Sequence, residues 1–300
     1  MIPNSLVVAA SKGGAGKTSL AGALASLAAV SGWRVLLVDL DPQGNQAREF
    51  GYMSESDGGR GLFNAVVTGS SVAPMRQVRE NLDVVAGGRH LRKLVNWLAA
   101  EAQDDPMAIQ GLEHALAEAA SEVDLVVVDT PPGEMLLHAA IANMGRFIVI
   151  PTQGDAASND GISEVLTLID GARHGNPPNP YLELLGVVVM FVPSGGTVLD
   201  RRIREDLTSL LGDEVTLFTP SVRYSKQAAL DLRERGLTVG EYEALRARST
   251  REHRWYEALR GGPAAPRFSS AAGGLAEDYQ RLSEAILSAF SSRVAEVERR

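Results

Sequence analysis

A glycine-rich segment near the N-terminus restricts this chain more than any other feature. Residues 12–19 read KGGAGKTS, and they follow a short apolar run, Leu6–Ala10, that has the composition of a buried strand. A helix-like pattern then runs from Ser19 to Val30. Glycines between a strand and a helix let backbone N–H groups turn inward around an anion, and the helix N-terminus adds partial positive charge. The order of strand, glycine loop and helix therefore predicts a phosphate-binding loop at the edge of a sheet.

The side chains of this loop have distinct predicted roles. Lys17 can reach the β- and γ-phosphates of a nucleotide, Thr18 can place its hydroxyl on Mg²⁺, and Ser19 can contact the α-phosphate. A turn that only joined a strand to a helix would not need this GKT ending. We therefore expect ATP and Mg²⁺ as ligands. The predicted ATP-binding residues of the loop are Gly13, Gly14, Ala15, Gly16, Lys17, Thr18 and Ser19.

The use of lysine sets this loop apart. The chain has 29 basic residues, and its lysines are Lys12, Lys17, Lys93 and Lys226. Two of them thus stand in one short loop. An ordinary phosphate loop needs Lys17 but not Lys12, so Lys12 requires a second explanation, and a solvated loop lysine is the alternative.

Carboxylates follow two further strand-like runs. Asp39 and Asp41 come at the end of the run that begins at Val35, and Asp129 follows Leu125–Val128. Because side chains alternate along a strand, Asp39 and Asp41 point to the same side, at the carboxyl end where parallel sheets bind ligands. A carboxylate there can hold Mg²⁺ through water. Ordinary capping of a strand end is the alternative.

Short β-branched apolar runs alternate with helix-period segments along the chain. This order predicts an α/β fold, a P-loop nucleotide hydrolase with a mostly parallel twisted sheet and helices on both faces. We expect one domain over residues 1–300, in which residues 238–274 are an insertion and flexible connection before a closing helix from about Ala276. The expected strands are Leu6–Ala10, Val35–Val38, Leu82–Val85, Leu125–Val128, Phe147–Ile150 and Leu185–Val192.

Composition excludes several classes of function. A net charge of −8 opposes general attraction to nucleic acid, so any DNA site must be a local patch. The chain has no cysteine, which excludes a disulfide framework, a thiol nucleophile and a cysteine-held cluster. Its apolar runs are far shorter than the roughly 20 residues of a membrane span. The N-terminus has no basic leader, so we expect a cytoplasmic protein.

These motifs together resemble the ParA/MinD family of P-loop ATPases with a deviant Walker A motif. Residues 12–19 match KGGxGK[ST], residues 39–45 match the DxDPQGN switch I, and residues 129–132 match the DTPP switch II. The stretch 220–225 and the last helix are also similar to the family, most of all to small ParA/Soj-like partition ATPases. The resemblance covers most of the chain.

The resemblance implies roles that spacing alone does not show. Lys12 would cross a dimer interface to the phosphates of the partner copy, and Lys17 would act within its own site. Asp41 would position the attacking water, and Asp39 and Asp129 would support the Mg²⁺ shell through water. Backbone near Pro220 would contact adenine, although the Arg-Asn pair that follows this proline in the family is replaced by Ser221 alone.

The resemblance also implies partners. The protein would form an ATP-sandwich homodimer, bind non-specific DNA in the ATP state, associate with the nucleoid, and be released when a ParB-like centromere-binding protein stimulates hydrolysis. Residues 194–197, SGGT, stand where many relatives carry a DNA-binding arginine. The candidate DNA contacts are Arg223, Arg201, Arg202, Arg204 and Lys226.

Two alternative functions stay open. A MinD-like membrane-associated ATPase would need a cationic last helix, whereas acidic residues offset the arginines of this one, so no membrane partner is expected. A ParA-like positioner of a non-DNA cargo would share every motif. An added helix over residues 241–259 is also expected, with Tyr242, Leu245, Tyr256 and Leu259 on a docking face and Arg248, Arg251 and Arg254 on a basic one.

Overall fold

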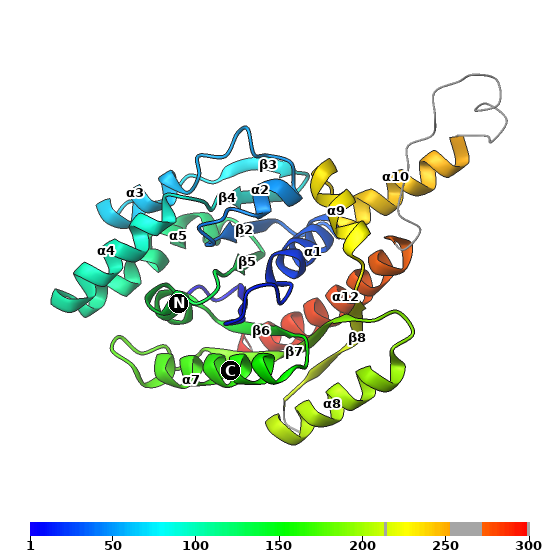
Figure 1. The fold of residues 1–300 in the computed structure, drawn as a ribbon. Coiled ribbons are helices and arrows are strands. Elements are labelled where there is room, and N and C mark those ends of the chain that lie inside the picture. The colour runs from blue at the N-terminus through cyan, green and yellow to red at the C-terminus, as the bar shows by residue number, and fades with distance from the viewer. Residues whose placement is uncertain (213–214, 253–271, 299–300) are drawn as a thin grey trace.

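The computed structural model describes residues 1–212, 215–252 and 272–298, and within them a single eight-stranded sheet forms the centre (Figure 1). The strand order is β3-β4-β2-β5-β1-β6-β7-β8, and every neighbouring pair is parallel except β3 with β4. The expected mostly parallel α/β fold is confirmed. The strands are β1 (Ser5–Val8), β2 (Val35–Asp39), β3 (Met75–Arg79), β4 (Leu82–Val85), β5 (Leu125–Asp129), β6 (Phe147–Thr152), β7 (Glu183–Val192) and β8 (Leu217–Arg223).

Helices cover both faces of the sheet. One hydrophobic core lies under α3 (Arg60–Thr68), α4 (Leu91–Asp104), η1 (Pro106–Gln110), α5 (Gly111–Ser121), α6 (Met135–Met144), α7 (Ala156–His174) and α8 (Thr197–Leu211). The other lies under α1 (Lys17–Val30), α2 (Gln46–Glu49), α9 (Lys226–Arg235), α10 (Val239–Glu252) and α12 (Ala272–Glu298). Side chains alternate between the cores, as in β1, where Val7 faces the first and Leu6 and Val8 face the second.

The edges of the sheet contain two strands that the apolar pattern does not reveal. Edge strand β3 reads MRQVR, and β8 contains Pro220, which a central strand would not tolerate. Both strands have few fully buried side chains because only one neighbour covers each of them. A search for apolar runs therefore misses both.

The closing helix α12 packs against the sheet, as expected. It begins at Ala272, four residues before the predicted start, and lies beside α1 in Figure 1. Leu282 and Ile286 are fully buried, and the Phe290 ring meets the rings of Trp33 and Phe147. The apolar face of this helix is thus part of the core.

The added helix is present as α10, although its docking face is smaller than expected. Tyr242 is fully buried and its hydroxyl donates to Asp231 at 2.7 Å, but Leu245 is 40% exposed. The prediction that Leu245 docks is therefore wrong, since one tyrosine anchors this turn. Arg248 is exposed, as expected. The Arg251 side chain and residues 254–259 lie outside the described part of the chain.

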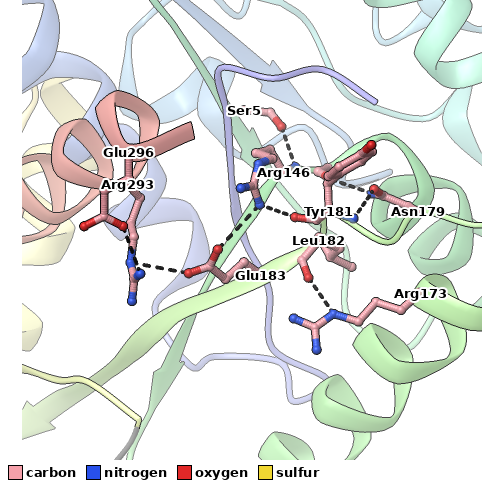
Figure 2. A network of polar contacts seen from close by, with 10 residues as sticks. Ser5, Arg146, Arg173, Asn179, Tyr181, Leu182, Glu183, Arg293 and Glu296 are labelled. Carbon is pink, nitrogen blue, oxygen red and sulfur yellow. Dashed lines mark hydrogen bonds and ion pairs between the residues drawn. The ribbon is translucent and has the colours of Figure 1, made fainter. Parts of the chain in front are cut away.

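A polar network ties α12 to the amino-terminal ends of β6 and β7 (Figure 2). Arg146 is buried, donates to the Tyr181 carbonyl, and lies 3.6 Å from the Glu183 carboxylate. Its guanidinium also covers the Phe147 ring at 4.4 Å from the ring centroid. Glu183 in turn pairs with Arg293 of α12 at 3.4 Å.

No helix among the described residues has the length and apolarity needed to cross a membrane.

Candidate active site

The site is built where strands β1, β2 and β5 end side by side. Register pairs Val8 with Asp129 and Asp39 with Asp129, so the loops after all three strands leave from one point at the carboxyl edge. In open α/β sheets this edge is where ligands bind. The glycine loop after β1 leads directly into α1 at Lys17.

The conformation of the loop requires glycine. Gly14 has a φ of 78° and Gly16 a φ of 92°, values that other residues rarely adopt. A Cβ on Gly16 would lie 2.8 Å from the Met190 Cε and 3.1 Å from the Phe191 ring, so no side chain fits there. Gly13 and Gly14 instead face open space. The loop thus presents bare backbone to an open volume, as a phosphate cradle must.

Lys17 is buried inside the cradle. Its ammonium donates to the Lys12 carbonyl at 3.1 Å, which folds the side chain back along the loop. Burial lowers the pKa of Lys17, and the carboxylates of Asp129 and Asp41 oppose that shift. A partly desolvated cation beside two carboxylates is well suited to bind an anionic phosphate.

Asp39 and Asp129 form a buried acidic pair. The Asp39 carboxylate accepts the backbone N–H groups of Asp41 at 2.9 Å and Gln46 at 3.2 Å. Burial raises the pKa of Asp39 well above its ordinary value, and the charge of Asp129 raises it further. Burial also raises the pKa of Asp129, against hydrogen bonds from Gln46 and Thr18. Lys17 is the nearby cation, and the two carboxyl groups keep raised pKa values beside it.

The arrangement fits Mg²⁺. Asp129 Oδ1 is buried without a hydrogen-bond partner, and Gln46 Oε1 is in the same condition. Thr18, Asp39 and Asp129 supply hard oxygen donors of the kind that Mg²⁺ prefers, directly or through water. The unsatisfied oxygen is therefore an independent indication of a cation at this position.

Asp41 lies beside these groups, and the predicted site residues of the loop and of the two strand ends come together. Asp41 is buried, and its Oδ1 accepts the Gln43 N–H at 2.8 Å, which fixes the orientation of the carboxylate. One oxygen is held by the backbone in this way, while the carboxylate contributes to the field at Lys17.

Lys12 lies on the rim, outside the cradle. Its ammonium pairs with Asp155 at 2.7 Å, and the two side chains are 36% and 50% exposed. Gln153 donates to the Gly14 carbonyl at 2.9 Å from the same loop after β6. The β6–α7 loop therefore contacts the phosphate loop through the Asp155 and Gln153 side chains, and Lys12 stays accessible to solvent.

Two site residues have no signal in the sequence. Gln46 is fully buried and donates both to the Thr18 carbonyl at 3.0 Å and to Asp129 at 2.9 Å, so it joins the loops after β1, β2 and β5. Glu49 accepts from Ser19 at 3.0 Å and pairs with Arg233 at 3.5 Å. Nothing in the local sequence around Gln46 or Glu49 predicts that either residue contacts a segment so distant in the chain.

Pro220, the residue expected near the adenine, lies on edge strand β8. In this strand Ser221 and the Phe218 carbonyl interact with Arg204 of α8. The Phe191 ring lies next to Gly16 of the phosphate loop, and its centroid is 6.1 Å from that of the Tyr224 ring. They line a cavity of about 270 Å³ that reaches Ser19.

Two of the candidate DNA contacts are held by carboxylates of the same chain. Arg223 is held by Asp278 of α12 through hydrogen bonds of 2.6 and 2.8 Å, and Arg204 is bound by Asp200 of its own helix. Arg201 and Arg202 are exposed on α8. The Lys226 side chain lies outside the described part of the chain.

A glycine loop after a central parallel strand, a lysine in its cradle and acidic residues at the ends of two neighbouring strands define the class of P-loop ATPases. The sequence profile described as "AAA domain" matches residues 4–182, more than half of the chain. The chromosome-partitioning ATPase Soj of Thermus thermophilus is 32% identical over 225 residues, covering 74% of this chain and 83% of the relative. The chain belongs to the ParA/MinD family of partition ATPases.

Solved structures extend the likeness of the fold to nearly the whole chain. Apo McdA from Cyanothece superposes with a TM-score of 0.71 at 17% identity, covering 95% of this chain and 98% of that one. Cobyrinic acid a,c-diamide synthase from Mycobacterium smegmatis, solved with an ATP analogue and magnesium, has a TM-score of 0.63 at 22% identity and covers 89% of this chain and 99% of that one. At these identities the likeness concerns the fold alone, and one fold serves different functions.

Proposed function

We propose that this protein is an ATP-dependent partition ATPase that dimerises around ATP, binds non-specific DNA in the ATP state, and is released from DNA by partner-stimulated hydrolysis. The observation that carries the proposal is the division between two lysines of one loop. Lys17 is buried in the cradle, whereas Lys12 stands on the rim with its ammonium in a surface ion pair. A surface pair of this kind is worth little free energy, so Lys12 can leave Asp155 for a stronger anion.

Within one copy, the residues at the carboxyl edge hold the nucleotide. Backbone N–H groups of the loop and the Lys17 ammonium bind the β- and γ-phosphates, and Ser19 contacts the α-phosphate. Thr18, Asp39 and Asp129 would hold Mg²⁺, which neutralises charge on the phosphate oxygens when bound. The Asp41 carboxylate accepts a hydrogen bond from the attacking water and orients this water toward the γ-phosphate.

Between copies, Lys12 completes the site. Transfer of the Lys12 ammonium from Asp155 to the phosphates of the partner copy adds positive charge where charge develops in the transition state. A two-fold axis makes this contact reciprocal, so ATP on both copies is bound by four lysines in all. Dimerisation therefore depends on ATP, and hydrolysis is slow until a partner protein, a ParB-like centromere-binding protein, orders the site.

DNA binding is expected of the dimer because the net charge of −8 opposes binding by one copy, whereas a dimer brings two copies of each local basic patch to the same DNA. The candidate contacts are Arg201 and Arg202 on α8, with Arg223 once it leaves Asp278. Lys226 and Arg204 complete the proposed set. A nucleoid-associated cytoplasmic location follows from binding DNA without sequence preference.

The experiment is co-sedimentation with non-specific duplex DNA in ATP, ADP and no nucleotide, with sizing by light scattering. Asp41→Ala should bind ATP, accumulate as a dimer and bind DNA, because it removes the water contact and leaves the cradle intact. Lys12→Ala should bind ATP with nearly parent affinity and stay monomeric. DNA binding that is equal in all three nucleotide states, or a Lys12→Ala dimer, would reject the proposal.

One observation favours a second candidate, a ParA-like positioner of a non-DNA cargo. Arg223, the foremost candidate DNA contact, is held by Asp278 through both its side chain and its backbone N–H. A positioner that binds a surface other than DNA would not need Arg223 as a DNA contact. The MinD-like alternative gains no support, because the apolar face of α12 is buried in the core. Failure of the ATP dimer to bind DNA, with dimerisation intact, would favour the second candidate.

A further inference from the structure

Gln46, the first residue of α2, contacts three parts of the nucleotide site. Its side-chain nitrogen donates to the Asp129 carboxylate at 2.9 Å and to the Thr18 carbonyl at 3.0 Å. Its backbone N–H donates to the Asp39 carboxylate at 3.2 Å. One fully buried residue therefore holds both carboxylates of the acidic pair and the end of the phosphate loop.

The orientation of the Gln46 amide follows from its partners. A carbonyl only accepts hydrogen bonds, so the amide atom that faces the Thr18 carbonyl must be the nitrogen. The opposite orientation would place the amide oxygen against the carbonyl oxygen and the Asp129 carboxylate. Oε1 of Gln46 is then left buried without a hydrogen-bond partner. A buried acceptor in this condition destabilises the fold, and a role in the site would explain why it is kept.

Gly22 of α1 leaves room for this amide. A Cβ on Gly22 would lie 3.2 Å from Gln46 Oε1 and 3.3 Å from Phe50 Cε2, so α1 and α2 approach each other closely here. Glycine in the middle of a helix is less stable than alanine. The packing around the amide thus also has a cost in stability, and it restricts the movement of the Gln46 side chain.

The hydrogen bond from Gln46 leaves Asp129 with one oxygen held and one oxygen free. Nε2 of Gln46 donates to Oδ2, whereas Oδ1 is buried without a partner. Oδ1 is therefore the oxygen that can face a cation or a water of its shell. Hydrogen bonds of this kind orient the carboxylates that act at metal ions, and their loss typically lowers metal affinity about 10- to 100-fold.

We propose that Gln46 is a positioning residue for Mg²⁺, because its amide holds Asp129 in the orientation that receives the ion together with ATP. Gln46 acts through Asp129 and does not touch the ion. The inference rests on the proposed function in one respect, namely that Thr18, Asp39 and Asp129 hold Mg²⁺. Since Gln46 directly follows switch I, its hydrogen bonds also couple the position of that switch to the metal site.

A purely structural role for Gln46 would have a different signature. If Gln46 only joined three loops, its loss would weaken ATP binding to the same extent with and without Mg²⁺. A positioning role instead predicts a loss confined to the complex that contains Mg²⁺. The ratio of the two affinities therefore separates these roles, even where a variant is less stable than the parent.

The test is a titration with a fluorescent ATP analogue in Mg²⁺ and in EDTA. Gln46→Met keeps the side-chain length and the backbone N–H but removes the amide donor. This variant should lower the ratio of affinity in Mg²⁺ to affinity in EDTA at least about tenfold, with nearly parent affinity in EDTA. Gln46→Asn is a second variant, whose amide is too short to reach both acceptors, and it should lower the ratio in the same direction.

Asn143 provides a matched control. It is buried in α6, and its side-chain nitrogen donates to the Pro177 carbonyl at 2.9 Å. Asn143→Leu therefore removes a buried amide donor that bonds a carbonyl outside the nucleotide site. Urea unfolding should show a loss of stability in this variant, while the ratio of its affinities in Mg²⁺ and EDTA should equal that of the parent.

Each outcome decides between these roles. A parent ratio in Gln46→Met and Gln46→Asn, or equal losses in Mg²⁺ and EDTA, would overturn the positioning role. An equal fall in Asn143→Leu would assign the effect to lost stability and would overturn it as well. A parent that binds the analogue equally in Mg²⁺ and EDTA would instead contradict the proposed metal site itself, so the parent measurement distinguishes the two failures.

Discussion

Charged side chains are paired at one end of the sheet and form a buried acidic pair at the other. At the amino-terminal ends of the strands, Arg146, Glu183 and Arg293 form a chain of ion pairs and hydrogen bonds that fastens α12 (Figure 2). At the carboxyl ends, Asp39 and Asp129 are buried with raised pKa values, and Asp129 Oδ1 has no hydrogen-bond partner. Two like charges buried close together cost free energy, even where hydrogen bonds offset part of that cost. The protein therefore holds a destabilising cluster at one end, where ligands bind, and stabilises the fold at the other.

The largest effect is expected at the carboxyl end, from Lys17→Ala. Loss of the cradle ammonium should lower ATP hydrolysis by a factor of about 10³ or more, because the charge on the transferred phosphoryl group is no longer stabilised. Stability should change little. Phosphate release and urea unfolding measure the two quantities, and Lys93→Ala on the exposed surface of α4 is the control. Hydrolysis at the parent rate would remove Lys17 from the site.

The next effect is expected at the opposite end, from Arg146→Ala. Removal of a buried guanidinium leaves Glu183 and the Tyr181 carbonyl without this partner, which should cost about 3 kcal/mol of unfolding free energy. Under conditions in which both proteins are folded, the variant should bind ATP with the same affinity as the parent. Arg293→Ala, at a residue 52% exposed, should cost less than about 1 kcal/mol and serves as the comparison. Equal losses in the two variants would show that burial does not decide the value of this network.

A smaller effect of the opposite sign is expected from Asp129→Asn. This change removes one of two buried like charges, so the protein without nucleotide should gain about 1 kcal/mol of unfolding free energy near pH 7. Stimulation of hydrolysis by Mg²⁺ should be lost at the same time. Because the pKa of Asp129 is raised, the gain should shrink as pH falls and the parent carboxyl group becomes neutral. Unfolding at pH 5 and pH 7 checks this trend, and a destabilised variant would contradict it.

The smallest effect is expected from Arg34→Gln at the start of β2. Arg34 hydrogen-bonds the Asp124 carboxylate through its backbone and side chain, and these bonds lower the pKa of Asp124. A lowered pKa contributes stability above the unfolded value, and that contribution is lost as pH falls through the folded one. Parent and variant should therefore differ slightly at pH 7 and converge below about pH 4. A constant difference across that range would assign the effect to packing.

Much of the fold could be predicted from local patterns. The six expected strands follow from β-branched runs, and the glycine loop with its GKT ending places one of them beside a nucleotide. Asp39, Asp41 and Asp129 could be predicted because a strand end fixes where a side chain points. These inferences need only the next few residues along the chain, and the structure confirms the ones that concern the strands.

The remaining features depend on contacts between distant segments. Gln46 meets Asp129 across 83 positions and Lys12 meets Asp155 across 143, and no local pattern indicates either partner. Arg223 was expected to face DNA, yet Asp278 from a helix 55 positions away holds it. The cavity of about 810 Å³ lined by residues of α6 and α7 likewise exists only once these two helices have packed on one face of the sheet. Tertiary packing, not propensity, decides such contacts.

The position of α12 beside α1 has a consequence for synthesis. Ala272 emerges from the ribosome 242 residues after Val30, so at about 5–20 residues per second α1 waits about 12 to 50 s for the helix that covers it. During that time the side of α1 that faces α12 lacks its final cover, including Ala23, which lines one cavity together with Leu275 and Tyr279 of α12. We expect the nascent chain to expose this apolar surface to chaperones, and to gain protease resistance in the N-terminal half only after residues 272–298 have been made.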